Sequence, residues 1–326
     1  MSASATIESA ETDRVGAQSG SSDPQVHEYR GRAMGTRLHV LVVGDPALVD
    51  FAVKRVDQLE SRWSRFIDNS EISRCNNTRG IPVDVSTDTR NLVRHAIHGW
   101  TETAGAYDPT VLDSLIASGY DRSYEILLEE GADASLIDDA VPAPGCDGIE
   151  INDEFGTVTL PLNTGFDPGG IGKGLAADML VEELMAAGAN GAMVNLGGDL
   201  RVAGAAPTPD HWVVEVEEPT VKDGRIALTV MIDGGLATST TRRRVWTVGG
   251  RQCNHVIDPR IGRPVESEAQ LATVISGRAW WSEVLATQLL LTPADRWEEV
   301  TGDAASLIID SDGNTHTFGS MKDHLR

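Results

Sequence analysis

The residues best suited to chemistry lie in the run FDPGGIGKGLAAD, from Phe166 to Asp178. Glycines in such a run let backbone N–H groups approach a ligand closely, and the N-terminus of the helix that follows favours an anion. Lys173 adds a positive charge, and Asp167 can accept a hydrogen bond from a ligand or help to hold a metal. The run predicts a phosphate-binding site, while a glycine-rich strand-to-helix turn without a ligand is the alternative for an isolated run.

Two well-known phosphate-binding motifs can be compared with this run. The Walker pattern does not fit, because no Ser or Thr follows Lys173 and the four-residue gap after the first glycine is absent. The dinucleotide fingerprint fits as GKGLAA, from Gly172 to Ala177, but the alternating βαβ series expected around it is not evident. A nicotinamide dehydrogenase therefore stays open as an alternative that predicts NAD binding.

Three shorter clusters also carry polar groups in suggestive places. VNLGGDL, residues 194–200, reads as a strand that ends in two glycines and an acid, and NHVIDPR, residues 254–260, places His255 before an Asp-Pro turn. Glu283 and Thr287 are four residues apart, so they share one helix face and offer oxygen ligands of the kind that magnesium or calcium prefers. Each cluster also has a structural explanation, as a turn, a structural histidine or an ordinary helix face.

The elements that must position these residues are indicated by hydrophobic periodicity and turn residues. Strands are expected at residues 36–44, 212–217, 225–232 and 272–276, and hairpins at 149–160 and 306–318. Helices are expected at residues 45–66, 89–105, 174–188 and 280–291, with a helix-rich stretch after YDPTV to about residue 140. DNSEISRCNN, residues 68–77, is expected as a polar turn segment. This mixture predicts an α+β fold, a mixed sheet with packed helices.

Bulk composition excludes several classes of protein. The formal net charge of -22 argues against a nucleic-acid partner, because a phosphate backbone attracts a concentrated positive surface. No stretch approaches the roughly 18 consecutive apolar residues that membrane insertion requires. Cys75, Cys146 and Cys253 show neither a zinc nor a disulfide spacing. We expect residues 1–28 to be a disordered polar tail without an export signal, and residues 29–326 to form a single domain of a cytoplasmic protein.

In combination and in order, these pieces resemble the ApbE-type FAD:protein FMN transferase family. The likeness runs through AMGT, SRF with DNSEISRCN, YDPTV, DPGGIGKG, VNLGGD, HVIDPRIGRPV and the helix of Glu283 and Thr287, and covers almost everything from residue 29 onward. The resemblance implies an ApbE-like flavin transferase fold. It also implies Mg²⁺-dependent transfer of FMN from FAD, the substrate, to a Thr or Ser hydroxyl of an acceptor protein, with release of AMP.

Carried over position by position, the resemblance implies a role for single residues. It gives flavin or adenine contacts to Met34, Phe66, Gly119, Tyr120 and Asp121, and FAD binding to Asp167, Lys173 and His255. It gives Mg²⁺ ligation to the Gly170 carbonyl, Glu283 and Thr287. The proton of the attacking hydroxyl would pass to His255 or to Asp167.

Two departures from the family pattern leave alternatives open. The family usually has Asp where this chain has Glu283, so the metal site must accommodate one more methylene, or the protein binds FAD without turnover. A Mg²⁺-dependent pyrophosphatase that splits FAD into FMN and AMP would use the same site with water as the acceptor. Many relatives are exported lipoproteins, whereas the acceptor expected here must be reachable from the cytoplasm.

Overall fold

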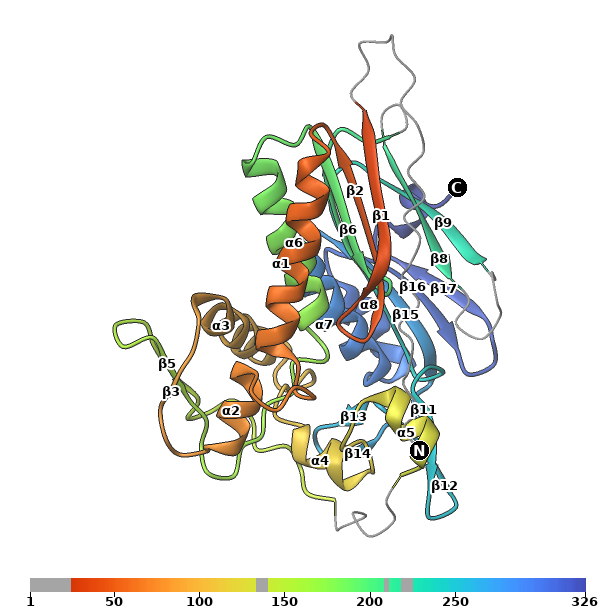
Figure 1. Cartoon of the computed structure of the whole chain (residues 1–326). Coiled ribbons are helices and arrows are strands. Elements are labelled where there is room, and N and C mark those ends of the chain that lie inside the picture. Colours follow the sequence, from red (N-terminus) through yellow and green to blue (C-terminus); the bar gives the residue numbers. More distant parts are fainter. Residues whose placement is uncertain (1–24, 133–139, 208–210, 218–224) are drawn as a thin grey trace, which may run out of the picture.

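A computed structural model describes residues 25–132, 140–207, 211–217 and 225–326, and Figure 1 shows its architecture. Its centre is an eight-stranded sheet in which each pair of neighbours is antiparallel. In spatial order its strands are β1 (Val26–Ala33), β2 (Thr36–Val43), β6 (Gly191–Leu196), β7 (Asp199–Gly204), β10 (Gly234–Thr240), β15 (Ala269–Ser276), β16 (Ala305–Asp310) and β17 (Thr315–Phe318). The α+β class is confirmed, although this sheet is antiparallel rather than mixed.

Three long helices cover one face of the sheet (Figure 1). They are α1 (Ala47–Trp63), α6 (Gly172–Ala186) and α7 (Ala279–Leu290). Alternate residues of β2 are buried against them, since Leu38, Val40 and Val42 share one apolar cluster with Val56 of α1 and Leu180 of α6. This period-two burial is what the sequence of a strand with one covered face predicts.

A hairpin covers part of the opposite face. Its strands, β8 (Trp212–Glu217) and β9 (Arg225–Met231), contribute Trp212, Val214 and Met231 to an apolar cluster with Val202 of β7 and Leu236 of β10. The sheet is therefore enclosed between helices on one face and a hairpin on the other, which fixes the ends of β6, β7 and β10 where the polar motifs lie.

Helix α3 (Thr87–Glu102), three short helices and several short strands form a second group at one end of the sheet (Figure 1). The short helices there are α2 (Glu71–Asn77), α4 (Leu112–Ala117) and α5 (Tyr124–Glu130). The strands are β3 (Val83–Asp84), β4 (Glu150–Asn152), β5 (Thr157–Thr159), β11 (Val245–Val248), β12 (Arg251–Asn254), β13 (Ile257–Asp258) and β14 (Arg263–Pro264). Of the remaining helices, α8 (Trp297–Thr301) lies between α7 and β16, and α9 (Met321–His324) follows β17.

Two local expectations need correction. DNSEISRCNN is not a turn, because Ser70 accepts a hydrogen bond from Ser73 N at 2.9 Å and so caps helix α2, which buries Ile72 and Cys75. Strand β1 begins at Val26 and pairs with β2 up to Val43, so residues 26–28 belong to the sheet rather than to a tail. Residues 1–24 of the expected tail lie outside the described part of the chain.

The structure around GKGLAA does not support the nicotinamide dehydrogenase alternative. GKGLAA does open helix α6, but the strand that follows that helix, β6, pairs antiparallel with β2 and β7. The dinucleotide fingerprint requires a parallel βαβ unit around the glycines. Among the described helices, none is long and apolar enough to cross a membrane.

Candidate functional site

The polar motifs converge on one large cavity of about 1020 Å³ at the junction of the sheet and the second group of elements. Nine of the eleven residues predicted for the site line it: Met34, Phe66, Tyr120, Asp167, Gly170, Lys173, His255, Glu283 and Thr287. Gly119 and Asp121 do not line the cavity. A Cβ on Gly119 would lie 2.9 Å from Ala132 Cβ, and the Asp121 carboxylate pairs with Arg122 at 2.8 Å.

The loop before α6 is held in place by hydrogen bonds from both of its sides. The side-chain amide of Asn76 accepts from Phe166 N at 2.7 Å and donates to Phe166 O at 2.9 Å, and Asp167 N donates to Pro109 O at 2.8 Å. Gly169 N donates to Asp167 Oδ1 at 2.6 Å. Asn76 lies in the segment first read as a turn, so its role in fixing the loop was not predicted.

Arg65 links Asp167 to the aromatic side of the cavity. Its guanidinium forms an ion pair with Asp167 Oδ2 at 2.6 Å, and both side chains are almost fully buried. The same guanidinium lies 4.1 Å from the ring centroid of Phe66 and 4.7 Å from that of Tyr120, a cation–π arrangement. Asp167 is therefore already engaged by a cation and a backbone amide.

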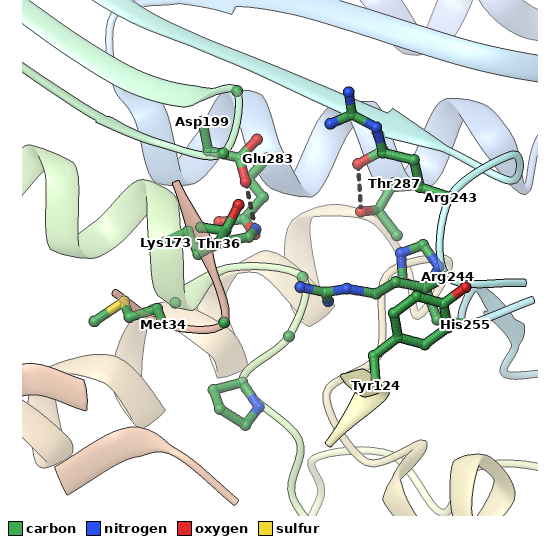
Figure 2. A pocket seen from close by; sticks show the side chains of 18 of the residues that line it. Met34, Thr36, Tyr124, Lys173, Asp199, Arg243, Arg244, His255, Glu283 and Thr287 are labelled. Atoms are coloured by element: carbon green, nitrogen blue, oxygen red, sulfur yellow. Dashed lines mark hydrogen bonds and ion pairs between the residues drawn. The ribbon is translucent and has the colours of Figure 1, made fainter. Parts of the chain in front are cut away.

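Lys173 lies between two carboxylates. Its ammonium group donates to Asp199 Oδ2 and to Glu283 Oε1, and Glu283 Oε2 accepts from Gly174 N at 2.8 Å (Figure 2). Burial lowers the pKa of Lys173, but Asp199 and Glu283 outweigh burial and raise it. Burial raises the pKa of Glu283, with Asp199 reinforcing and Lys173 opposing that shift. This paired cluster leaves Lys173 without excess positive charge.

Helices α6 and α7 cap each other around this cluster. Glu283 of α7 accepts from the first turn of α6, and Asp178 of α6 accepts from Ala279 N at 3.0 Å and Trp280 N at 2.9 Å at the start of α7. A Cβ on Gly174 would lie 2.5 Å from Ala279 O, so only glycine permits this approach. Burial raises the pKa of Asp178 to about 6.

The oxygens near Gly170 suit a hard cation. A Cβ on Gly170 would lie 3.6 Å from Thr287 Oγ1, which itself lies 3.3 Å from Ser239 Oγ. The nearby Tyr107 hydroxyl is buried and has no partner among the described residues. In the same residues, no group of three or more His, Cys, Asp and Glu side chains is placed to hold a metal. These hydroxyls and the Glu283 carboxylate, which also lines the cavity, are hard oxygen ligands of the kind that Mg²⁺ uses together with substrate phosphates.

His255 lies on the opposite side of the cavity from the paired cluster (Figure 2). The ring is half-buried, and its Nδ1 is covered and has no hydrogen-bond partner among the described residues. Burial, with Arg244 and Lys173, lowers the pKa of His255 to about 3. The imidazole is therefore neutral at pH 7.

Comparison with known proteins gives a consistent result. The model of the ApbE family matches residues 34–308. The FAD:protein FMN transferase of Salmonella typhimurium is 29% identical over 289 residues, 85% of this chain and 81% of that protein. The one from Vibrio cholerae is 27% identical and covers 83% of each chain. The crystal structure of the ApbE protein from Thermotoga maritima superposes with a TM-score of 0.82 at 26% identity, covering 93% of this chain and 100% of that one. Motifs, fold and cavity thus agree with the family match, and the chain belongs to the ApbE family.

Proposed function

We propose that this protein is an FAD:protein FMN transferase, which moves the FMN half of FAD onto a Thr or Ser hydroxyl of an acceptor protein and releases AMP. The observation that carries the proposal is the single cavity of about 1020 Å³ that joins the α6 N-terminus, an aromatic side and a neutral histidine. Its size is at the upper end for small-molecule sites, as a dinucleotide requires. The relatives named for this activity match over about four fifths of their length.

FAD would lie across the cavity between two kinds of surface. Phe66, Tyr120 and Met34 offer apolar and aromatic area for a flavin or adenine ring. In the loop from Asp167 to Gly172 the other backbone N–H groups already donate within the protein, so among the described residues Gly170 N is the amide left for a phosphate at this helix N-terminus. In this proposal residues 29–326 form one catalytic domain.

His255 is the residue best placed to receive the proton of the acceptor hydroxyl. It is neutral at pH 7 and its Nδ1 has no partner in the described residues, whereas Asp167 is bound by Arg65 and Gly169. General-base catalysis requires a lone pair on the acceptor, and the neutral imidazole of His255 has one.

Glu283, Thr287 and the Gly170 carbonyl would hold Mg²⁺, which neutralises charge on the phosphates when it is bound. The hydrogen bonds from Lys173 and Gly174 do not exhaust the Glu283 carboxylate, because its two oxygens have about four lone-pair sites. Glu283→Gln keeps the shape but removes the charge. We expect EDTA to abolish transfer and Glu283→Gln to reduce it steeply, while Glu283→Asp retains part of it. A Glu283→Gln variant with unchanged rate and unchanged Mg²⁺ dependence would exclude this metal site.

The function is tested by expressing the chain with candidate acceptors that carry a Thr or Ser flavinylation segment. Mass spectrometry should find one FMN-sized adduct on the acceptor hydroxyl, and none when the residue is Ala. A pyrophosphatase would instead release free FMN with the acceptor unmodified, and a non-catalytic FAD-binding protein would release no AMP. We propose that the acceptor is reachable from the cytoplasm.

A further inference from the structure

The cations along the cavity are mostly paired with carboxylates of this chain. The pairs in the described residues are Arg30 with Glu28, Arg37 with Glu217, Arg243 with Glu217, Arg65 with Asp167, and Lys173 with both Asp199 and Glu283. Lys173 in particular is shared by two buried carboxylates, so its charge is more than balanced inside the protein. An anionic substrate would gain little from these paired groups.

Arg244 differs from the other cations of the cavity. Within the described residues its guanidinium has neither an ion-pair partner within 4.0 Å nor a hydrogen bond. It is half-buried and lines the cavity. Figure 2 shows its side chain extending into the pocket beside His255, whereas the Arg243 side chain points elsewhere. A half-buried cation without a partner favours the binding of an anion. It does so here in a chain whose net charge is -22.

The backbone around Arg244 is strained and held in place. Arg244 has a φ of 50°, a conformation that non-glycine residues rarely adopt. The next residue, Val245, is fixed by the Tyr124 hydroxyl, which donates to Val245 O at 3.0 Å and accepts from Val245 N at 3.1 Å. Strain that the surroundings maintain in this way is found mostly at functional sites, where it orients a side chain before the ligand arrives.

We propose that Arg244 contacts the diphosphate group of FAD in this cavity and is a catalytic residue of FMN transfer. The inference rests on the proposed function and assigns the phosphate contact to Arg244 in place of Lys173. Lys173 then acts as a positioning residue, which holds Asp199 and Glu283 at the start of α6.

The transfer step defines what Arg244 would do. The acceptor hydroxyl oxygen forms a bond to the phosphorus of the FMN half, while the bond from that phosphorus to the bridging oxygen breaks and AMP leaves with the electron pair. The hydroxyl proton passes to His255. Arg244 donates hydrogen bonds to the non-bridging phosphate oxygens, where negative charge lies. The bound anion also offsets the repulsion by which Arg244 opposes protonation of His255.

The test compares two ligands that differ in phosphate. Binding of FAD and of riboflavin, which has no phosphate, is measured by flavin fluorescence in EDTA for the wild type, Arg244→Asn and Arg244→Lys. Asn tolerates a positive φ, so it removes the charge without adding backbone strain. Arg296→Gln makes the same change in net charge at an exposed residue paired with Glu299 outside the cavity, and serves as the control.

We expect Arg244→Asn to weaken FAD binding about 10- to 100-fold, as the loss of a charge-assisted hydrogen bond predicts. Arg244→Lys should weaken it less, and riboflavin binding should be unchanged in both variants. Equal losses for FAD and riboflavin, or no loss for FAD, would overturn the inference. If Arg244→Asn does not fold, the same selective loss in Arg244→Lys decides the question.

The outcome separates this inference from the proposed function. If the wild type modifies an acceptor and Arg244→Asn does so at the same rate with the same FAD affinity, the Arg244 contact is wrong and the transferase stands. If Arg244→Asn loses FAD affinity selectively but the wild type attaches no FMN to any acceptor, the contact stands and the transferase does not.

Discussion

On one side of the cavity Lys173 is enclosed by Asp199 and Glu283, whereas on the other side His255 Nδ1 and the Arg244 guanidinium have no partner in the described residues. On the first side each charged group has a partner within the protein, and the cluster also joins α6 to α7. The second side has polar groups whose burial is costly unless something binds them. The difference indicates which residues build the site and which ones meet the substrate.

The largest effect is expected from removing the proton acceptor on the unpaired side. His255→Asn should fold normally and lower the rate of FMN transfer about 10²- to 10⁴-fold, because general-base catalysis is lost. Transfer is measured as AMP release in the presence of an acceptor. His98→Asn, at an exposed residue near Glu102, is the matched control. Residual transfer near the wild-type rate together with a large fall in Tm would make His255 a structural residue.

Substitutions on the paired side should lower the free energy of unfolding, and not only the rate of FMN transfer. Lys173→Met leaves two buried carboxylates next to each other and should lower the free energy of unfolding by about 3–5 kcal/mol. Adding Glu283→Gln should then cost less than the sum of the two single changes, because the charges are coupled. Urea unfolding of the two single variants and the double variant measures these losses, with exposed Lys54→Met as the control. If the losses of the two single variants add up to that of the double variant, the charges of Lys173 and Glu283 are not coupled.

The sequence predicted local features better than contacts between distant segments. The start of α3 follows from the Ser86 cap, which accepts from Thr89 N at 3.3 Å, and α6, α7 and the last hairpin lie where the sequence predicted them. Strand β10 was not predicted, since GGLATST has two glycines and little alternation. A short helix such as α2 depends on its cap and on two buried side chains, a signal that its polar composition conceals.

Within the site, residue types were predictable but their partners were not. The glycine-rich run and Glu283 with Thr287 are recognisable from spacing alone. The ion pair of Arg65 with Asp167 joins residues about a hundred positions apart, and that of Lys173 with Glu283 joins residues still farther apart. Such pairs depend on how α1, α6 and α7 pack, and so Lys173 was first assigned the phosphate contact.

A smaller effect should appear in the pH dependence of stability. The folded-state pKa of His255 is about 3 and its ordinary value is 6.5, so between these values the unfolded chain binds a proton that the folded protein does not. Stability is therefore lost as the pH falls through this window, by about 2 kcal/mol at pH 5 for this group alone. The wild type should lose that much more than His255→Asn between pH 7 and pH 5. Equal losses would show that His255 can be protonated in the folded state.

The smallest effect concerns the link between α6 and α7. Asp178→Ala leaves Ala279 N and Trp280 N without their acceptor and should lower the free energy of unfolding by about 1–2 kcal/mol. Exposed Asp57→Ala is the control. Urea unfolding measures the change in stability, and FMN transfer should fall only modestly. If transfer falls as far as in His255→Asn, the paired side takes part in the chemistry directly.

The central claim, that the cavity transfers FMN to a protein, is tested most directly by the balance of products from FAD. The purified protein is incubated with FAD, Mg²⁺ and an acceptor, and AMP, free FMN and covalently bound FMN are quantified together. The account predicts that AMP and protein-bound FMN appear in equal amounts with little free FMN, and that both vanish in EDTA. AMP matched by free FMN, with no flavin on the acceptor, would contradict it and identify a pyrophosphatase.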